Sequence, residues 1–255
     1  MGNDKTIREI KYMNIAKAFG IVAFVIGHSS SPITHFIYQW HMALFYFISG
    51  YFYKDKYSKD PILLIKKRVK SLYLPYIKYG LLFLFLHNLF FRLNIYSDKV
   101  GYLDKVSHLY TKTEFLKNIL STFAFGTREQ LLGVFWFIVS LFTVNILFCF
   151  ISFFIERYYK EKNKITKESI RFIIILVCFT IGNLATFYNI KLYRFIDTSL
   201  VALSIYYLSY LYKRYEKIIT MKLYYTLIAL VLLLLNSLYG SINVGLNIYL
   251  CPTFF

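Results

Sequence analysis

Long apolar stretches recur along this chain, and they constrain its fold more than any other feature. Each stretch is about 17–24 residues long, and about 20 apolar residues are enough for a helix to cross the hydrocarbon core of a membrane. Hydrocarbon offers no partners to backbone N–H and C=O groups, so such segments cross it as helices. The sequence therefore predicts an all-α membrane protein, a polytopic bundle of about seven to eight transmembrane helices. The expected spans are 15–33, 35–53, 73–93, 132–155, 170–189, 192–212 and 223–239, followed by an incomplete apolar segment at 240–255.

Positive charge lies in alternate connections between these stretches. The formal net charge is +17. Basic residues gather in the N-terminal arm and in the connections 54–70, 156–171 and 213–222, whereas 29–34 carries none. An excess of lysine and arginine is typical of short cytoplasmic connections. We therefore expect a cytoplasmic N-terminus, with 29–34 and the long segment 94–130 outside, and anionic membrane lipid rather than nucleic acid as the partner of the basic residues.

The remaining composition favours a single domain without a metal. No internal repeat is detectable, so residues 1–255 are expected to form one transmembrane domain in the cell membrane. The three cysteines, Cys149, Cys178 and Cys251, lie in apolar surroundings without the spacing of metal ligands. We predict that they are buried thiols.

Ionisable side chains in the first two expected spans give the strongest functional signal. An ionisable group is costly in hydrocarbon, so it is a functional candidate by default. Lys17 and His28 are eleven residues apart, which places them on nearly the same helix face at a separation of about 16 Å. The short connection 29–34 makes the first two spans antiparallel neighbours, so His41 is expected to lie near His28.

The two histidines suit acid–base chemistry. Hydrocarbon disfavours a charged imidazole, and a neutral imidazole beside a cavity can act as a general base for a hydroxyl. The alternative is a structural role, in which each histidine donates to a backbone carbonyl or bridges neighbouring helices. We expect His35, beside Pro32, at the membrane interface, and His87 in packing or in the lining of a pore.

Further candidates lie at the end of the second expected span, in the segment that follows it, and at the start of the fourth. Ser49 and Gly50 form a small pair that permits close helix contact. The segment 61–76 alternates basic and apolar residues and is expected to lie on the inner leaflet, where Arg68 either anchors to lipid or contacts the phosphates of a nucleotide-bearing cofactor. Trp136 fits either a substrate contact or an interfacial aromatic belt.

Taken in order, these motifs resemble the acyltransferase-3 family of integral-membrane acyltransferases, which modify cell-surface polysaccharides, lipopolysaccharide, peptidoglycan or related glycans. The hallmark of that family is a basic residue followed, after ten intervening positions, by a histidine, here Lys17 and His28. The family usually has an aspartate three residues before the basic residue, where this chain has Asn14. The resembling segments are Arg8, NIAKAFGIVAFVIGH (14–28), WHMALFYFISGY (40–51), KKRVKSLYLPY (66–76) and VFWFIVSLF (134–142).

The resemblance implies a reaction and a role for each of these residues. It implies that an acyl group, commonly acetyl from cytoplasmic acetyl-CoA, is transferred to a hydroxyl of a cell-surface or capsular glycan or a lipid-linked sugar. The plasma membrane of a bacterium is the expected location, and no metal takes part. His28 would be the general base or carry the acyl group transiently, and His41 would orient His28 or the substrate. The residues implied to bind donor or substrate are Arg8, Asn14, Lys17, Ser49, Arg68 and Trp136.

The length of the chain is the basis of a second hypothesis about its function. Members of the family typically have about ten spans, so this chain is expected to lack the last spans of the family. The alternative function is therefore that of a non-catalytic or truncated membrane protein of glycan assembly or export.

Overall fold

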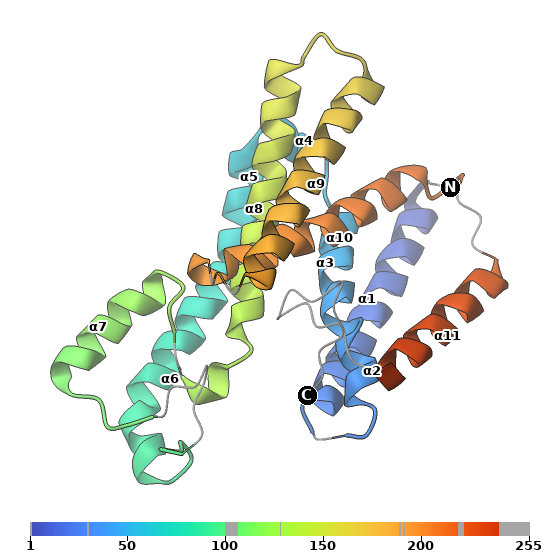
Figure 1. Ribbon diagram of the computed structural model, residues 1–255. Coiled ribbons are helices and arrows are strands. Elements are labelled where there is room, and N and C mark those ends of the chain that lie inside the picture. Colours follow the sequence, from blue (N-terminus) through green and yellow to red (C-terminus); the bar gives the residue numbers. More distant parts are fainter. Residues whose placement is uncertain are drawn as a thin grey trace.

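The structure is a computed structural model, drawn in Figure 1. It describes residues 2–29, 31–99, 107–127, 129–188, 190, 192–218 and 222–239, and only the backbone of residues 2–10 and 239. This described part of the chain is helical and contains no strand. Its elements are α1 (Gly2–Gly27), α2 (Thr34–Tyr38), α3 (His41–Tyr51), α4 (Lys56–Lys59), α5 (Pro61–Arg68), a π-helical turn (Val69–Tyr73), α6 (Leu74–Arg92), α7 (Lys112–Phe123), a 3-10 turn (Gln130–Leu132), α8 (Phe135–Tyr158), α9 (Lys164–Phe187), a 3-10 turn (Tyr193–Phe195), α10 (Ile196–Tyr215) and α11 (Leu223–Tyr239).

Within the described residues, three helical segments are long and apolar enough to cross a membrane. They are Pro61–Arg92, in which α5, the π-helical turn and α6 follow one another without a break, α8 and α9. They coincide with the spans expected at 73–93, 132–155 and 170–189. An all-helical membrane protein is thereby confirmed, and the larger number of seven to eight spans stays a prediction.

The second expected span, 35–53, is not one continuous helix. Gln39 and Trp40 form a turn that separates α2 from α3. The first helix also ends earlier than expected, at Gly27. α2 packs on α1 and on α11, whereas α3 packs mainly on α10 and α1. α1 and α3 nevertheless pack against each other, as the short connection 29–34 predicts.

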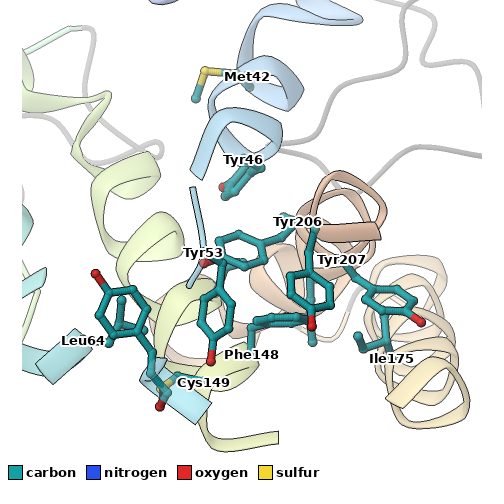
Figure 2. Close-up of a cluster of buried hydrophobic side chains, with 14 residues drawn as sticks. Met42, Tyr46, Tyr53, Leu64, Phe148, Cys149, Ile175, Tyr206 and Tyr207 are labelled. Carbon is teal, nitrogen blue, oxygen red and sulfur yellow. Dashed lines mark hydrogen bonds between the residues drawn. The ribbon is translucent and has the colours of Figure 1, made fainter. Parts of the chain in front are cut away.

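The core lies where α3, α8 and α10 meet. α10 packs on both α3 and α9, and α8 contacts α10 from a third side. Large aromatic side chains fill the space between them (Figure 2). The Phe148 ring lies 5.0 Å from the Tyr206 ring and 4.8 Å, edge to face, from the Tyr53 ring. The predicted burial of the cysteines is confirmed for Cys149, whereas Cys178 is half-buried and Cys251 lies outside the described residues.

Close contact between α3 and α10 depends on Gly50. A Cβ atom at this position would overlap the backbone carbonyl of Tyr206 and would lie 2.6 Å from the Ser209 hydroxyl oxygen. That hydroxyl donates to the Phe47 carbonyl on α3. Since small residues let helix backbones approach one another, the pair Ser49–Gly50 has the packing role that the sequence predicts.

We expect Gly50→Ala to destabilise the protein by about 1–3 kcal/mol, because the added methyl group must push α10 away from α3. Gly20→Ala on α1 is the matched control, since its Cβ would meet only the side chains of Leu44 and Phe45, at 3.1 Å. Thermal unfolding in detergent measures the difference. Equal midpoints for the two variants would contradict a backbone contact at Gly50.

Candidate functional site

His28 lies just beyond the end of α1, beside two aromatic rings. Its backbone N–H donates to the carbonyls of Phe24 and Val25, which holds the residue against the last turn of the helix. The ring centroid of His28 is 4.6 Å from that of Phe24 and 5.6 Å from that of Tyr38. The Tyr38 hydroxyl lies 3.4 Å from Nδ1 of His28. His28 itself is exposed, so an external group can reach its ring.

His41 begins α3 and is buried, with 3% of its surface exposed. Its Nδ1 lies 2.9 Å from the Ile37 carbonyl oxygen. A carbonyl oxygen can only accept, so Nδ1 carries the hydrogen, and the neutral ring then has its lone pair on Nε2. The structural role considered above, donation to a backbone carbonyl, therefore applies to one nitrogen of His41 and leaves the other basic.

Tyr38 lies between the two histidines. Its ring stacks on that of His41 at 5.3 Å and 29°, and its hydroxyl faces His28. The ring of Phe24 also belongs to this group, with its centroid 6.1 Å from that of His41. The structure thus brings His28 and His41 together around Tyr38, which sequence reasoning missed. The signal was present, because Tyr38 precedes His41 by three residues, nearly one helical turn.

α11 contacts this group through Gln39, in the turn between α2 and α3. The Gln39 amide nitrogen donates to the Leu233 carbonyl at 3.2 Å, and its amide oxygen accepts from Asn236 at 2.8 Å. Gln39 is buried. Both ends of its side chain are therefore bonded to the same helix.

Lys17 lies at the opposite end of the α1–α3 pair. Its Nζ is 5.4 Å from the centroid of the Phe52 ring, directly after α3. Asn14 is exposed on the same helix, and Arg8 lies on α1 with its side chain outside the described part of the structure. The ten residues between Lys17 and His28 all belong to α1, which ends at Gly27, so the two groups are separated by about 16 Å along one axis.

Two further predicted residues meet at the same end of α3. Arg68 donates from Nη2 to the Ser49 hydroxyl at 3.2 Å, and Ser49 donates to the Asn145 side-chain oxygen at 3.2 Å. The Tyr206 hydroxyl donates to that oxygen as well, at 3.0 Å. Nε of Arg68 is buried without a hydrogen-bond partner. We call Ser49, Arg68, Asn145 and Tyr206 the polar cluster.

Sequence reasoning missed Asn145 and Tyr206 in this cluster. Asn145 is fully buried on α8 and donates to the Leu141 carbonyl at 2.7 Å. An amide in an otherwise apolar span was the available signal. Within the polar cluster, the guanidinium group of Arg68 is bonded to Ser49, three residues before Phe52. The amine of Lys17 lies over the Phe52 ring. Two cations therefore lie near the same end of α3.

Trp136 is not part of either group. It packs against Phe137 and Phe195, with ring centroids 6.1 Å away in each case, and against the edge of the core. Among the described residues it forms no ring contact with His28 or His41. A pocket of about 470 Å³ opens between α9 and α10, lined by residues such as Lys164, Glu168 and Tyr207, and it contains none of the predicted site residues. The described residues include no group of three or more His, Cys, Asp or Glu that could hold a metal ion.

We expect Asn145→Leu to cost about 1–3 kcal/mol of stability, because the buried Tyr206 hydroxyl and the half-buried Ser49 hydroxyl would then lose their acceptor. Thr143→Val on the same helix is the control, since the Thr143 hydroxyl bonds only to the carbonyl of Val139, within α8. Thermal unfolding of both variants in detergent makes the comparison. A loss no larger for Asn145→Leu than for Thr143→Val would show that the polar cluster contributes nothing to stability.

Comparison with known proteins assigns a family to this arrangement. A family model described as an acyltransferase domain, that of the acyltransferase-3 family, matches residues 10–249. The match includes both histidines, Lys17 and the polar cluster. No curated protein and no solved structure matches the chain.

Proposed function

The chain belongs to the acyltransferase-3 family of membrane acyltransferases, and on this premise we propose that it transfers an acetyl group from acetyl-CoA to a hydroxyl of a cell-surface or capsular glycan, with His28 as the general base. The observation that supports this proposal is the placement of complementary groups at the two ends of one helix pair. His28, Tyr38 and His41 lie at one end of α1 and α3, and Lys17 and Arg68 lie at the other.

The histidine end suits activation of an acceptor hydroxyl. His28 is exposed and can accept a proton from a hydroxyl that lies within hydrogen-bond reach. The oxygen then attacks the carbonyl carbon of the acetyl thioester, the C–S bond breaks, and the thiolate of coenzyme A leaves and takes up a proton. The hydroxyl of Tyr38 lies beside Nδ1 of His28, and the ring of His41, whose Nε2 carries the lone pair, stacks on that of Tyr38. Transient transfer of the acetyl group to His28 itself is the other route consistent with these residues.

The cationic end suits a donor that carries phosphates. Lys17 and Arg68 are strong partners for phosphate oxygens, and hydrogen bonds between ionised groups are the stronger kind. Because the N-terminus is expected in the cytoplasm, this end of the helix pair faces the compartment that holds acetyl-CoA.

We expect His28→Ala to abolish acetylation of the surface glycan while the amount of protein in the membrane stays unchanged. NMR of the isolated glycan measures its acetyl groups, and immunoblotting measures the protein. His35→Ala is the matched control, because His35 is exposed on α2 and has no part in the proposed chemistry. Acetylation that persists in His28→Ala would remove His28 from the mechanism, and loss of the glycan itself would favour a role in assembly or export.

We expect Lys17→Met to raise the KM for acetyl-CoA by about tenfold or more and to change kcat less, since a lost charge-assisted bond is worth about 1.5–3 kcal/mol. Acetyl transfer from labelled acetyl-CoA in membrane vesicles measures both constants. Lys11→Met, an exposed position on the same helix, should leave KM unchanged. A KM that is the same in both variants would exclude Lys17 from donor binding.

A further inference from the structure

The segment between α6 and α8, expected from the sequence to be an outer loop, contains the helix α7, which lies alongside α6 (Figure 1). The beginning of α7 is fixed near the end of α6. Asn88 on α6 donates from its amide nitrogen to the Tyr110 carbonyl at 3.0 Å and accepts from the Tyr110 N–H at 2.7 Å. With the N-terminus in the cytoplasm, α6 runs from the inner to the outer face, so this end of α7 lies near the outer face.

The other end of α7 meets the early part of α6. The Tyr73 hydroxyl donates to the Phe123 carbonyl at 2.8 Å. A Cβ at Gly80 would lie 2.7 Å from the Thr122 methyl group, so the two helices touch there. Gly80 precedes Asn88 by eight residues, or about 12 Å of helix. α7 therefore runs antiparallel to α6 and descends by roughly that distance from the outer end.

After α7 the chain turns and returns to the outer end of α6. The Gly126 N–H donates to the Ser121 carbonyl at 2.7 Å, and the Thr127 N–H donates to the Tyr76 hydroxyl at 3.0 Å. Glu129 is already back at the outer end of α6, with Oε2 2.8 Å from Nδ1 of His87. We call residues 110–127 together with Glu129 the α7 hairpin.

The two ends of the α7 hairpin are closed by a buried pair. The side chains of His87 and Glu129 are 1% and 2% exposed, and the His87 ring stacks on Tyr110 at 3.5 Å and 7°. Nε2 of His87 donates to the His108 carbonyl at 2.9 Å. The bond to Glu129 then holds one proton, on either the imidazole or the carboxyl group. In both cases the pair carries no net charge, which lowers the cost of burying it.

The outward face of α7 is apolar and continues that of α6. Leu116, Leu120 and Phe123 are 60%, 65% and 49% exposed, and Phe85 on α6 is 64% exposed. The rings of Phe85 and Phe115 join the two helices at 5.3 Å. α6 belongs to a segment long and apolar enough to cross a membrane. Because the apolar face of α7 continues that of α6, we expect both faces to have the same surroundings.

We propose that the α7 hairpin is re-entrant: it enters the membrane from the outer face beside α6, presents Leu116, Leu120 and Phe123 to the acyl chains of the outer leaflet, and turns back within the bilayer at residues 124–127. Non-helical backbone is tolerated at such depth only where protein groups satisfy it. The N–H groups of Ala124, Phe125, Gly126 and Thr127 all have protein acceptors.

The polar groups of α7 fit the same orientation. Thr111 and Glu114 form a capping box at its first turn, and the exposed Glu114 pairs with His108 at 3.0 Å. This charged end lies at the outer face. Lys112 and Lys117 are exposed in the outer half of the helix, from which a long side chain can extend its amine to the lipid headgroups.

Depth measurements on spin-labelled protein test this placement. With the three cysteines replaced by alanine, single cysteines at positions 112, 116, 120 and 123 carry a nitroxide label in the otherwise complete protein, reconstituted in vesicles of phosphatidylethanolamine and phosphatidylglycerol. We expect contact with dissolved oxygen to rise, and contact with a water-soluble relaxation agent to fall, steadily from 112 to 123. The depth should increase by about 1.5 Å per residue. Equal shallow depth at all four positions, or free access of the water-soluble agent to 120 and 123, would overturn the proposal.

The role of the buried pair is tested in the same labelled protein. We expect His87→Phe, which retains a ring against Tyr110 but leaves Glu129 unpaired, to draw the label at position 120 into contact with the water-soluble agent. Adding Glu129→Met should restore its depth, because neither polar group then remains. His108→Ala, which keeps the carbonyl that His87 uses, is the control and should change nothing. An unchanged depth in His87→Phe would show that the pair does not hold the hairpin.

Discussion

Hydrocarbon supplies no hydrogen-bond partners, and the arrangement of polar side chains in this protein follows from that constraint. Where α3, α8 and α10 meet, hydroxyl and amide groups bond to one another across the helices. Tyr46 donates to Ser140 at 2.8 Å, and Ser140 also lies 3.0 Å from Ser199. Asn145 accepts from both Ser49 and Tyr206. Because each contact joins two helices, the polar groups fix the rotation of α3, α8 and α10 about their axes, which apolar packing alone specifies less sharply.

This rotation positions the two ends of α3. Gly50 brings the backbone of α3 against α10, and Ser49 beside it holds Arg68. Eight residues before Ser49, at the start of the helix, His41 contacts Tyr38, which faces His28. The groups proposed to contact donor and acceptor are thus carried on α1 and α3 or, for Arg68 at the end of α5, bonded to α3.

Part of this arrangement could be predicted from local spacing. The connection 29–34 is too short for any but an antiparallel pair, and eleven residues of helix return to the same face, so the Lys17–His28 axis and the approach of His41 followed directly. The break at Gln39 and Trp40 did not, and one of the helices on which α2 packs, α11, is distant in the chain. Asn145, Glu129 and His87 acquire their partners from positions that are distant in the chain, and no spacing rule links them. α7 was not predicted, because its 12 residues are too few to give a hydropathy signal.

The side chain of Gln39 links the group around the histidines to a distant part of the chain. Its amide group bonds through both its nitrogen and its oxygen to α11, and Asn236 lies 197 positions further along. Gln39 adjoins Tyr38 and is two residues before His41. A displacement of α11 must therefore either break two part-buried hydrogen bonds or carry the turn between α2 and α3 with it. The orientation of the imidazoles is in this way coupled mechanically to a helix that contributes no side chain to the proposed chemistry.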